Sequence, residues 1–224
     1  MATLADLENA IDMLLNHPLG LGRYQLVRPV EGKAYEAYVF GLCLRAVREL
    51  GVTPVLCGIN GTPAPFIFRG GPGQIHSRVK NFGYASFQIN GYEFEIHAGV
   101  EFKGTSRMVH ELDVCIMRSE NAIACRRQPD DPPAASLIAG WECKFYDGNL
   151  KKVLGRAFVG LMDDMGTNAR LSGLCSNSSH VQLRDYFQLQ RRPFPHFGLT
   201  PLQPSNEDIF VNLIKAKLKK MTAA

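Results

Sequence analysis

The sequence predicts a mixed α/β domain whose sheet is antiparallel in its first part. Residues 84–102 alternate polar and apolar side chains on both sides of Asn90-Gly91, which is the pattern of a β-hairpin closed by a tight turn. Apolar residues recur at helical spacing before and after this region, at 33–50 and 149–165. Strands therefore occupy the middle of the chain, and helices lie on either side of them.

The remaining elements follow from turn residues and apolar runs. Gly51 ends the helix that begins at residue 33, and Asn60-Gly61 divides two short strands. We expect loops at 126–136 and 191–204, the first exposed and the second wrapping the surface, because prolines interrupt both segments. In chain order, the expected elements are a helix at 3–16, a connection at 20–30, a helix at 33–50, strands at 55–59 and 65–70, the hairpin, strands at 110–117 and 137–146, a helix at 149–165, strands at 173–175 and 181–189, and a helix from 205.

Composition bounds the class of protein. The 224 residues suit a single domain, and 46% hydrophobic residues can build a core. The net charge of +4 permits a polyanionic partner without requiring one. No apolar run reaches the ~20 residues that span a bilayer, and the first residues carry acids but no base, so we expect a cytoplasmic protein that does not enter a membrane. The cysteines have no paired short spacing for zinc, so we expect buried free thiols.

The segments 110–117 and 137–146 carry charges inside apolar strands. Asp113 lies within the run from Leu112 to Ile116, and Glu142 and Lys144 interrupt the second strand. Buried charges are costly unless they are paired or bind a metal. Side chains two apart on a strand point to the same face, so Glu142 and Lys144 project together, and Asp113 joins them if the strands are neighbours.

This set of residues is typical of a magnesium site that acts on phosphate. Mg²⁺ prefers hard oxygen ligands, which Asp113, Glu142 and the backbone carbonyl of Cys143 would supply. A metal so placed polarises a phosphate and lowers the pKa of an attacking water, and Mn²⁺ should substitute for it. Lys144 would neutralise charge that develops on the phosphate. A structural network of salt bridges on an exposed strand face is the alternative.

These motifs resemble those of the PD-(D/E)XK, or restriction-endonuclease-like, nucleases. HELDVCIM is similar to the family's Asp-bearing strand and WECKFY to its (D/E)XK strand, with a helix following. EGKAYEAYVFGLCL resembles the first core helix of the resolvase-like and Mrr-like branches, and there Glu36 takes the place of a glutamate that reaches toward the metal. The resemblance implies an α-β-β-β-α-β core over about residues 31–190, with 1–30 and 191–224 as additions that contribute extra terminal helices. Two features depart from the family pattern: Leu112 precedes Asp113 in place of a proline that many members also lack, and the Pro-rich loop makes the interval from Asp113 to Glu142 long.

Several further residues have two readings. Glu111 is either an extra ligand or the solvated edge of its strand, and strand periodicity favours the edge. His110 is either a general base or a polar residue at the strand start. The candidates for binding nucleic acid are Lys103, Arg107 and Arg78. The sequence is equally consistent with ordinary charged residues on the surface at these positions. Gln182 and Arg184 on the strand expected at 181–189, and the lysines Lys215, Lys217, Lys219 and Lys220 near the C-terminus, have the same two readings.

The resemblance implies a magnesium-dependent DNA nuclease of restriction, repair or defence type. The segment 52–82 would shape substrate selection, and family members often form homodimers. No recognisable DNA-reading module is present, so sequence specificity is weak or comes from a separate specificity or guide partner. The alternatives are a retired nuclease fold that binds nucleic acid or acts as a scaffold, and a nuclease directed at RNA.

Overall fold

The computed structural model describes residues 2–16, 24–28, 30–148, 150–166, 171–178, 180–189 and 195–222. These residues form six α-helices, nine strands and one 3₁₀ turn at Ala134–Ser136. The helices are α1 Leu4–Asn16, α2 Glu31–Arg48, α3 Ser119–Arg127, α4 Lys152–Asp164, α5 Val181–Leu189 and α6 Pro204–Thr222. The strands are β1 Tyr24–Leu26, β2 Val55–Gly58, β3 Phe66–Phe68, β4 Gly83–Ile89, β5 Tyr92–Lys103, β6 Val109–Arg118, β7 Leu137–Lys144, β8 Leu171–Ser176 and β9 His196–Phe197.

The main sheet is mixed, and its first part is antiparallel as the sequence predicts. Its strand order is β2-β4-β5-β6-β7-β8-β9. All pairs from β2 to β7 are antiparallel, whereas β7, β8 and β9 run parallel to one another. A parallel pair needs a crossover connection, and α4 supplies it between β7 and β8. Strands β1 and β3 form a separate parallel pair.

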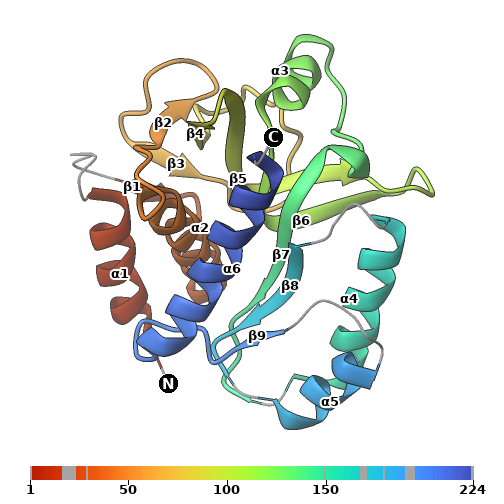
Figure 1. The fold of residues 1–224 in the computed structure, drawn as a ribbon. Helices are drawn as coiled ribbons and strands as arrows, with labels where there is room; N and C mark the ends of the chain where they lie inside the picture. Colours follow the sequence, from red (N-terminus) through yellow and green to blue (C-terminus); the bar gives the residue numbers. More distant parts are fainter. Residues whose placement is uncertain are drawn as a thin grey trace.

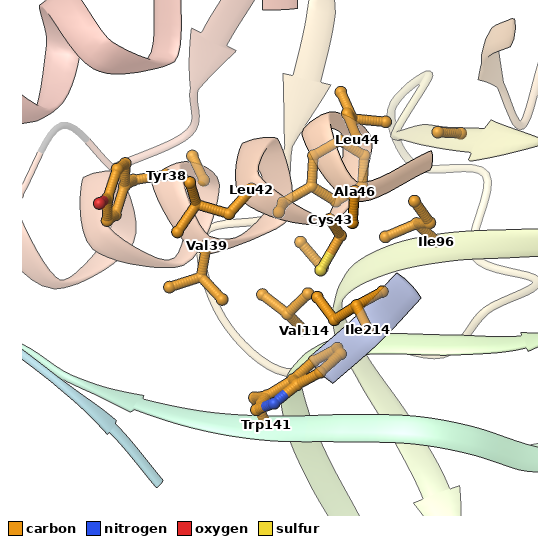
Figure 2. Close-up of a cluster of buried hydrophobic side chains, with 14 of the residues drawn as sticks. Tyr38, Val39, Leu42, Cys43, Leu44, Ala46, Ile96, Val114, Trp141 and Ile214 are labelled. Atoms are coloured by element: carbon orange, nitrogen blue, oxygen red, sulfur yellow. The ribbon is translucent and has the colours of Figure 1, made fainter. Parts of the chain in front are cut away.

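Helices cover both faces of this sheet (Figure 1). On one face, α1, α2 and α6 bury a core that includes Val114, Ile116 and Trp141. Figure 2 shows the side chains of α2 in this core above Val114 and Trp141. On the other face, Cys115 and Met117 pack with residues of α4 and α5. Because alternate residues of β6 enter different cores, its residues 112–117 are buried on both sides, and the Asp113 carboxylate among them is shielded from bulk water.

The hairpin of β4 and β5 confirms the turn predicted at Asn90-Gly91. Phe87 pairs with Phe94 and Ile89 with Tyr92, so two residues close the hairpin. Asn90 has a φ of 49° and Gly91 a φ of 82°. Positive φ at both central residues matches the right-handed twist of the strands, and Asn-Gly tolerates it best.

The strand predicted at 181–189 is wrong, because these residues form helix α5. Leu183 and Phe187 are buried against α4, and Tyr186 lies on the same side of the helix. The spacing of these three residues is helical, but the aromatic and β-branched content of the segment suggests a strand. Gln182 and Arg184 are consequently exposed on a helix and do not belong to the sheet.

Three other segments differ from expectation. Residues 119–127 form α3, a helix that the sequence did not predict. The loop expected at 126–136 is only partly exposed, since Asp131 and Ala134 are buried. Tyr24–Leu26 pairs with β3 within the expected connection, while residues 20–23 and 29 lie outside the described residues. The segment expected to wrap the surface at 191–204 contains β9 and the buried Leu199, and its residues 191–194 also lie outside the described part.

The other expected elements are confirmed within a few residues at their ends. The helix expected at 149–165 is shorter, beginning at Lys152. Among the cysteines, Cys57 is only half-buried, and the other five are buried free thiols. No helix among the described residues is both long and apolar enough to cross a bilayer.

Helix α5 can be distinguished from a strand by mutation. In a strand, Asp185 would share the buried face with Leu183 and Phe187, whereas in the helix Asp185 is exposed. We expect Phe187→Ala to lower the free energy of unfolding by about 3–5 kcal/mol and Asp185→Ala to change it by less than about 0.5 kcal/mol. Urea denaturation measures both, and a large effect of Asp185→Ala would contradict the helix.

Candidate functional site

The site is built where β6 separates from β7. Paired positions between the two strands end at Val114 and Trp141. Two residues further along β7, the Cys143 N–H donates to Oδ2 of Asp113 at 2.6 Å. A side-chain carboxylate thus replaces the backbone partner that the ladder would have provided. The N–H and C=O of one strand residue point to the same side, so the Cys143 carbonyl also faces this gap.

Asp113, Glu142 and Lys144 meet at this gap. The Lys144 Nζ lies 2.5 Å from Oε1 of Glu142 and 3.6 Å from Oδ2 of Asp113. Asp113 is 4% exposed. The two strands are neighbours, as the proposed metal site requires, and the three side chains that the sequence singled out form one cluster.

Helix α2 brings a second group of charges to the same cluster. Glu36 is buried, and the Lys33 Nζ donates to both of its carboxylate oxygens, at 2.6 and 2.8 Å. The same Nζ lies 3.8 Å from Oε1 of Glu111, and that oxygen is buried and accepts no hydrogen bond from the described residues. Glu111 as a whole is half-buried, with 24% of its side chain exposed, and its part as an extra ligand stays a prediction. Glu36, in contrast, is buried.

Buried carboxylates repel one another across this cluster. Burial, together with the neighbouring Asp113 charge, raises the pKa of Glu36 to about 8 and that of Glu111 to about 7. Burial and Asp113 also raise the pKa of Glu142. Burial alone would lower the pKa of Lys144, but the charges of Asp113 and Glu142 outweigh it and raise that pKa. Burial and the repulsion among the carboxylates therefore outweigh the attraction of Lys33 and Lys144.

A pocket of about 300 Å³ opens on this cluster from the side of α4. Glu111, Glu142 and Lys144 line its polar wall together with His110. Apolar side chains of α4 and β8 form the opposite wall: Leu154, Ala157, Phe158, Leu161 and Leu174. A substrate group can therefore reach the charged residues directly.

The carboxylate oxygens of the cluster are chemically suited to bind a hard divalent cation. In this structure, however, they form ion pairs with lysines. Among the described residues, no group of three or more His, Cys, Asp or Glu is arranged to hold a metal ion. Lys33 and Lys144 bind the carboxylates that would act as ligands. With all six groups ionised, four carboxylates and two lysines sum to a charge of −2, which a divalent cation balances. Clustered carboxylate oxygens are also the ligands that Mg²⁺ prefers.

The predicted nucleic-acid contacts lie apart from the carboxylates. Lys103 forms an ion pair with Asp130. Arg107 is exposed in the loop between β5 and β6, and Arg78 is exposed between β3 and β4. None of the three lines the pocket. Their contact with phosphate stays a prediction, and Gln182 and Arg184 lie on α5 instead of the sheet.

Sequence reasoning missed two residues at the site. Lys33 precedes Glu36 by about one helical turn, and this spacing places both side chains on one face of the helix. Their ion pair could therefore have been predicted from the sequence. Asp164, the last residue of α4, accepts hydrogen bonds from the β5–β6 loop and from His110. No local pattern marks Asp164, because its partners come from a distant part of the chain.

Comparison with protein-family models and with curated proteins found no match to this chain. The site must therefore be interpreted from its own geometry and chemistry.

Replacing Glu36 should change how stability depends on pH. Its pKa in the folded protein is about 8, above the ordinary 4.5, so folding favours the protonated form and stability falls as pH rises through this range. Glu36→Gln has no carboxyl group at this position and should not lose this stability. We therefore expect the free energy of unfolding of Glu36→Gln, relative to that of the wild type, to be higher at about pH 9 than at about pH 5 by about 1 kcal/mol or more. Urea denaturation at both pH values measures this.

Glu31→Gln is the matched control for that experiment, because Glu31 is exposed on the same helix. The control should follow the pH dependence of the wild type. An unchanged pH dependence in Glu36→Gln would mean that the Glu36 carboxyl is not buried among like charges.

Proposed function

We propose that the chain is a metal-dependent nuclease that hydrolyses phosphodiester bonds in DNA. The observation that carries the proposal is the meeting of Asp113, Glu142 and Lys144 beside an open pocket. These residues come from two strands that are distant in sequence, and a buried excess of carboxylate is costly without a cation to balance it. Perturbed carboxyl groups in a pocket are typical of functional sites.

The arrangement of elements supports a restriction-endonuclease-like core. Helix α2, strands β5, β6 and β7, helix α4 and strand β8 occur in the α-β-β-β-α-β order that the sequence resemblance implies, with β2, β3 and β4 inserted after α2 and α3 inserted before β7. Asp113 lies on the second of these strands, and Glu142 and Lys144 lie on the third. Glu36 on α2 approaches Asp113 closely enough for their charges to interact.

Asp113, Glu142 and Glu36 would hold the metal, with the Cys143 carbonyl as a further oxygen ligand. When bound, Mg²⁺ or Mn²⁺ supplies polarisation of the phosphate and a lowered pKa for water. The Cys143 N–H fixes the Asp113 carboxylate in place, so that this ligand needs no reorganisation. Glu111 remains beside Lys33 and would hold that lysine when Glu36 turns to the metal.

Lys144 would act on the phosphate itself. Its Nζ carries a full charge, since neighbouring carboxylates raise its pKa, and it lines the pocket. A cation placed where negative charge develops on phosphorus oxygens stabilises the transition state more than the substrate. The apolar wall of α4 would limit water around the reacting group and strengthen this interaction.

DNA is the proposed partner, in keeping with the net charge of +4. A homodimer would allow both strands to be cut, and a separate specificity or guide partner would supply sequence recognition. Two alternatives use the same site. An RNA-directed nuclease needs no other chemistry, and a retired nuclease fold would bind nucleic acid or act as a scaffold without cutting. The presence of both acids and the lysine beside an open pocket favours an active enzyme.

Purified protein should cut plasmid and linear DNA in Mg²⁺ or Mn²⁺. Glu142→Ala removes a ligand and Lys144→Ala removes charge stabilisation, so each should lower the cleavage rate by about 100-fold or more. Calorimetric titration with Mn²⁺ should show binding that Asp113→Asn abolishes. The same assay with RNA separates the two nuclease proposals.

Glu120→Ala is the control, since Glu120 is an exposed acid on α3. It should cut at the wild-type rate. Absence of both Mn²⁺ binding and cleavage in the wild type would favour the retired fold, and preferential cutting of RNA would replace DNA as the substrate.

A further inference from the structure

The loop between β5 and β6 is fastened to the end of α4 through Asp164. The Ser106 N–H donates to Oδ1 of Asp164 at 2.7 Å, and the Ser106 hydroxyl donates to Oδ2 at 2.5 Å. The Thr105 N–H bonds the Asp164 carbonyl at 2.7 Å. A Cβ on Gly104 would lie 2.3 Å from Oδ2, so only glycine allows this approach. Figure 1 shows the β5–β6 hairpin projecting on the side of the sheet where α4 lies.

His110 shares this anchor. Its Nε2 lies 2.5 Å from Oδ2 of Asp164. Hydrogen bonds from Ser106 and His110 hold the pKa of Asp164 well below its usual range, so its carboxylate is charged at neutral pH. A charged carboxylate only accepts hydrogen bonds, and Nε2 must therefore carry the proton. The neutral ring then has its lone pair on Nδ1, for which the described residues provide no hydrogen-bond partner.

The ring of His110 lines the same pocket as Glu142 and Lys144. The charged groups around it are Asp164 on α4 and the three pocket residues Glu111, Glu142 and Lys144. The remaining walls are apolar. A histidine fixed by a carboxylate, with its other nitrogen free beside a reaction pocket, has the arrangement of a general base.

We propose that His110 accepts the proton of the attacking water during phosphodiester hydrolysis and that Asp164 is its positioning residue. This inference rests on the nuclease function proposed above. As the water oxygen bonds to phosphorus, its proton moves to Nδ1 of His110. The bond from phosphorus to the leaving oxygen breaks, and its electron pair stays on that oxygen. The leaving oxygen takes a proton from solvent, and the imidazolium returns its extra proton to solvent.

His110→Gln is the informative variant, because a glutamine amide can still donate to Asp164 but cannot accept the water proton. We expect kcat to fall by about 100-fold and KM to stay within about threefold. In His110→Ala, added imidazole should restore kcat at least about tenfold, which loss of a structural contact would not allow. Asp164→Asn should lower kcat by at least about tenfold, since the ring loses its fixed tautomer.

Met108→Ala is the matched control, because the Met108 side chain is exposed in the same loop. The substitution leaves the side chains of Asp164 and His110 unchanged, so kcat should stay near the wild-type value. A readout independent of cleavage is the ¹⁵N spectrum of the His110 ring in metal-free protein at neutral pH. The proton should reside on Nε2 in the wild type and lose this preference in Asp164→Asn.

The outcomes separate the two proposals. If Glu142→Ala abolishes cleavage while folded His110→Gln keeps kcat within about twofold, the role of His110 is overturned and the nuclease proposal stands. A proton on Nδ1 in the wild type also overturns it. If the wild type cuts neither DNA nor RNA with Mg²⁺ or Mn²⁺, the nuclease function itself fails, and the role of His110 fails with it.

Discussion

The hydrogen bond from the Cys143 N–H to the Asp113 carboxylate defines the geometry of the whole site. It takes the place of a ladder bond where β6 leaves β7, and it satisfies a backbone donor that would otherwise be buried without a partner. The separation of the strands opens the space in which Glu142 and Lys144 project toward Asp113. The same divergence carries the start of β6 toward α4, where His110 meets Asp164.

Electrostatics explains why this cluster is poised for a cation. Four carboxylates are gathered from α2, β6 and β7, and burial makes their repulsion stronger than it would be in water. Lys33 and Lys144 offset part of that cost, and protonation at Glu36 and Glu111 offsets more near neutral pH. A divalent cation would relieve the repulsion further and would release protons on binding. Stability and the proposed metal binding would thus be coupled through the same few side chains.

The fold was predictable where local signals agree. The Asn90-Gly91 turn demands positive φ, and the alternation around it sets the register of β4 and β5. Helix α5 was predicted as a strand because Val181, Tyr186 and Phe187 favour strands, while burial of Leu183 and Phe187 against α4 favours a helix. Helix α3 was missed because it buries few apolar residues and gives a weak periodic signal.

The sequence by itself determined the mixed α/β class, the antiparallel start of the sheet and the identity of Asp113, Glu142 and Lys144, because charges inside apolar strands stand out by composition and period. The family resemblance had already pointed to Glu36. Only the tertiary structure decided that Glu36 lies near Asp113, that Glu111 lies beside Lys33, and that Asp164 lies within hydrogen-bond distance of His110. Those contacts join residues far apart along the chain, and their distances depend on how the strands diverge and the helices pack. A linear pattern does not contain that information, whereas burial and hydrogen-bond geometry do.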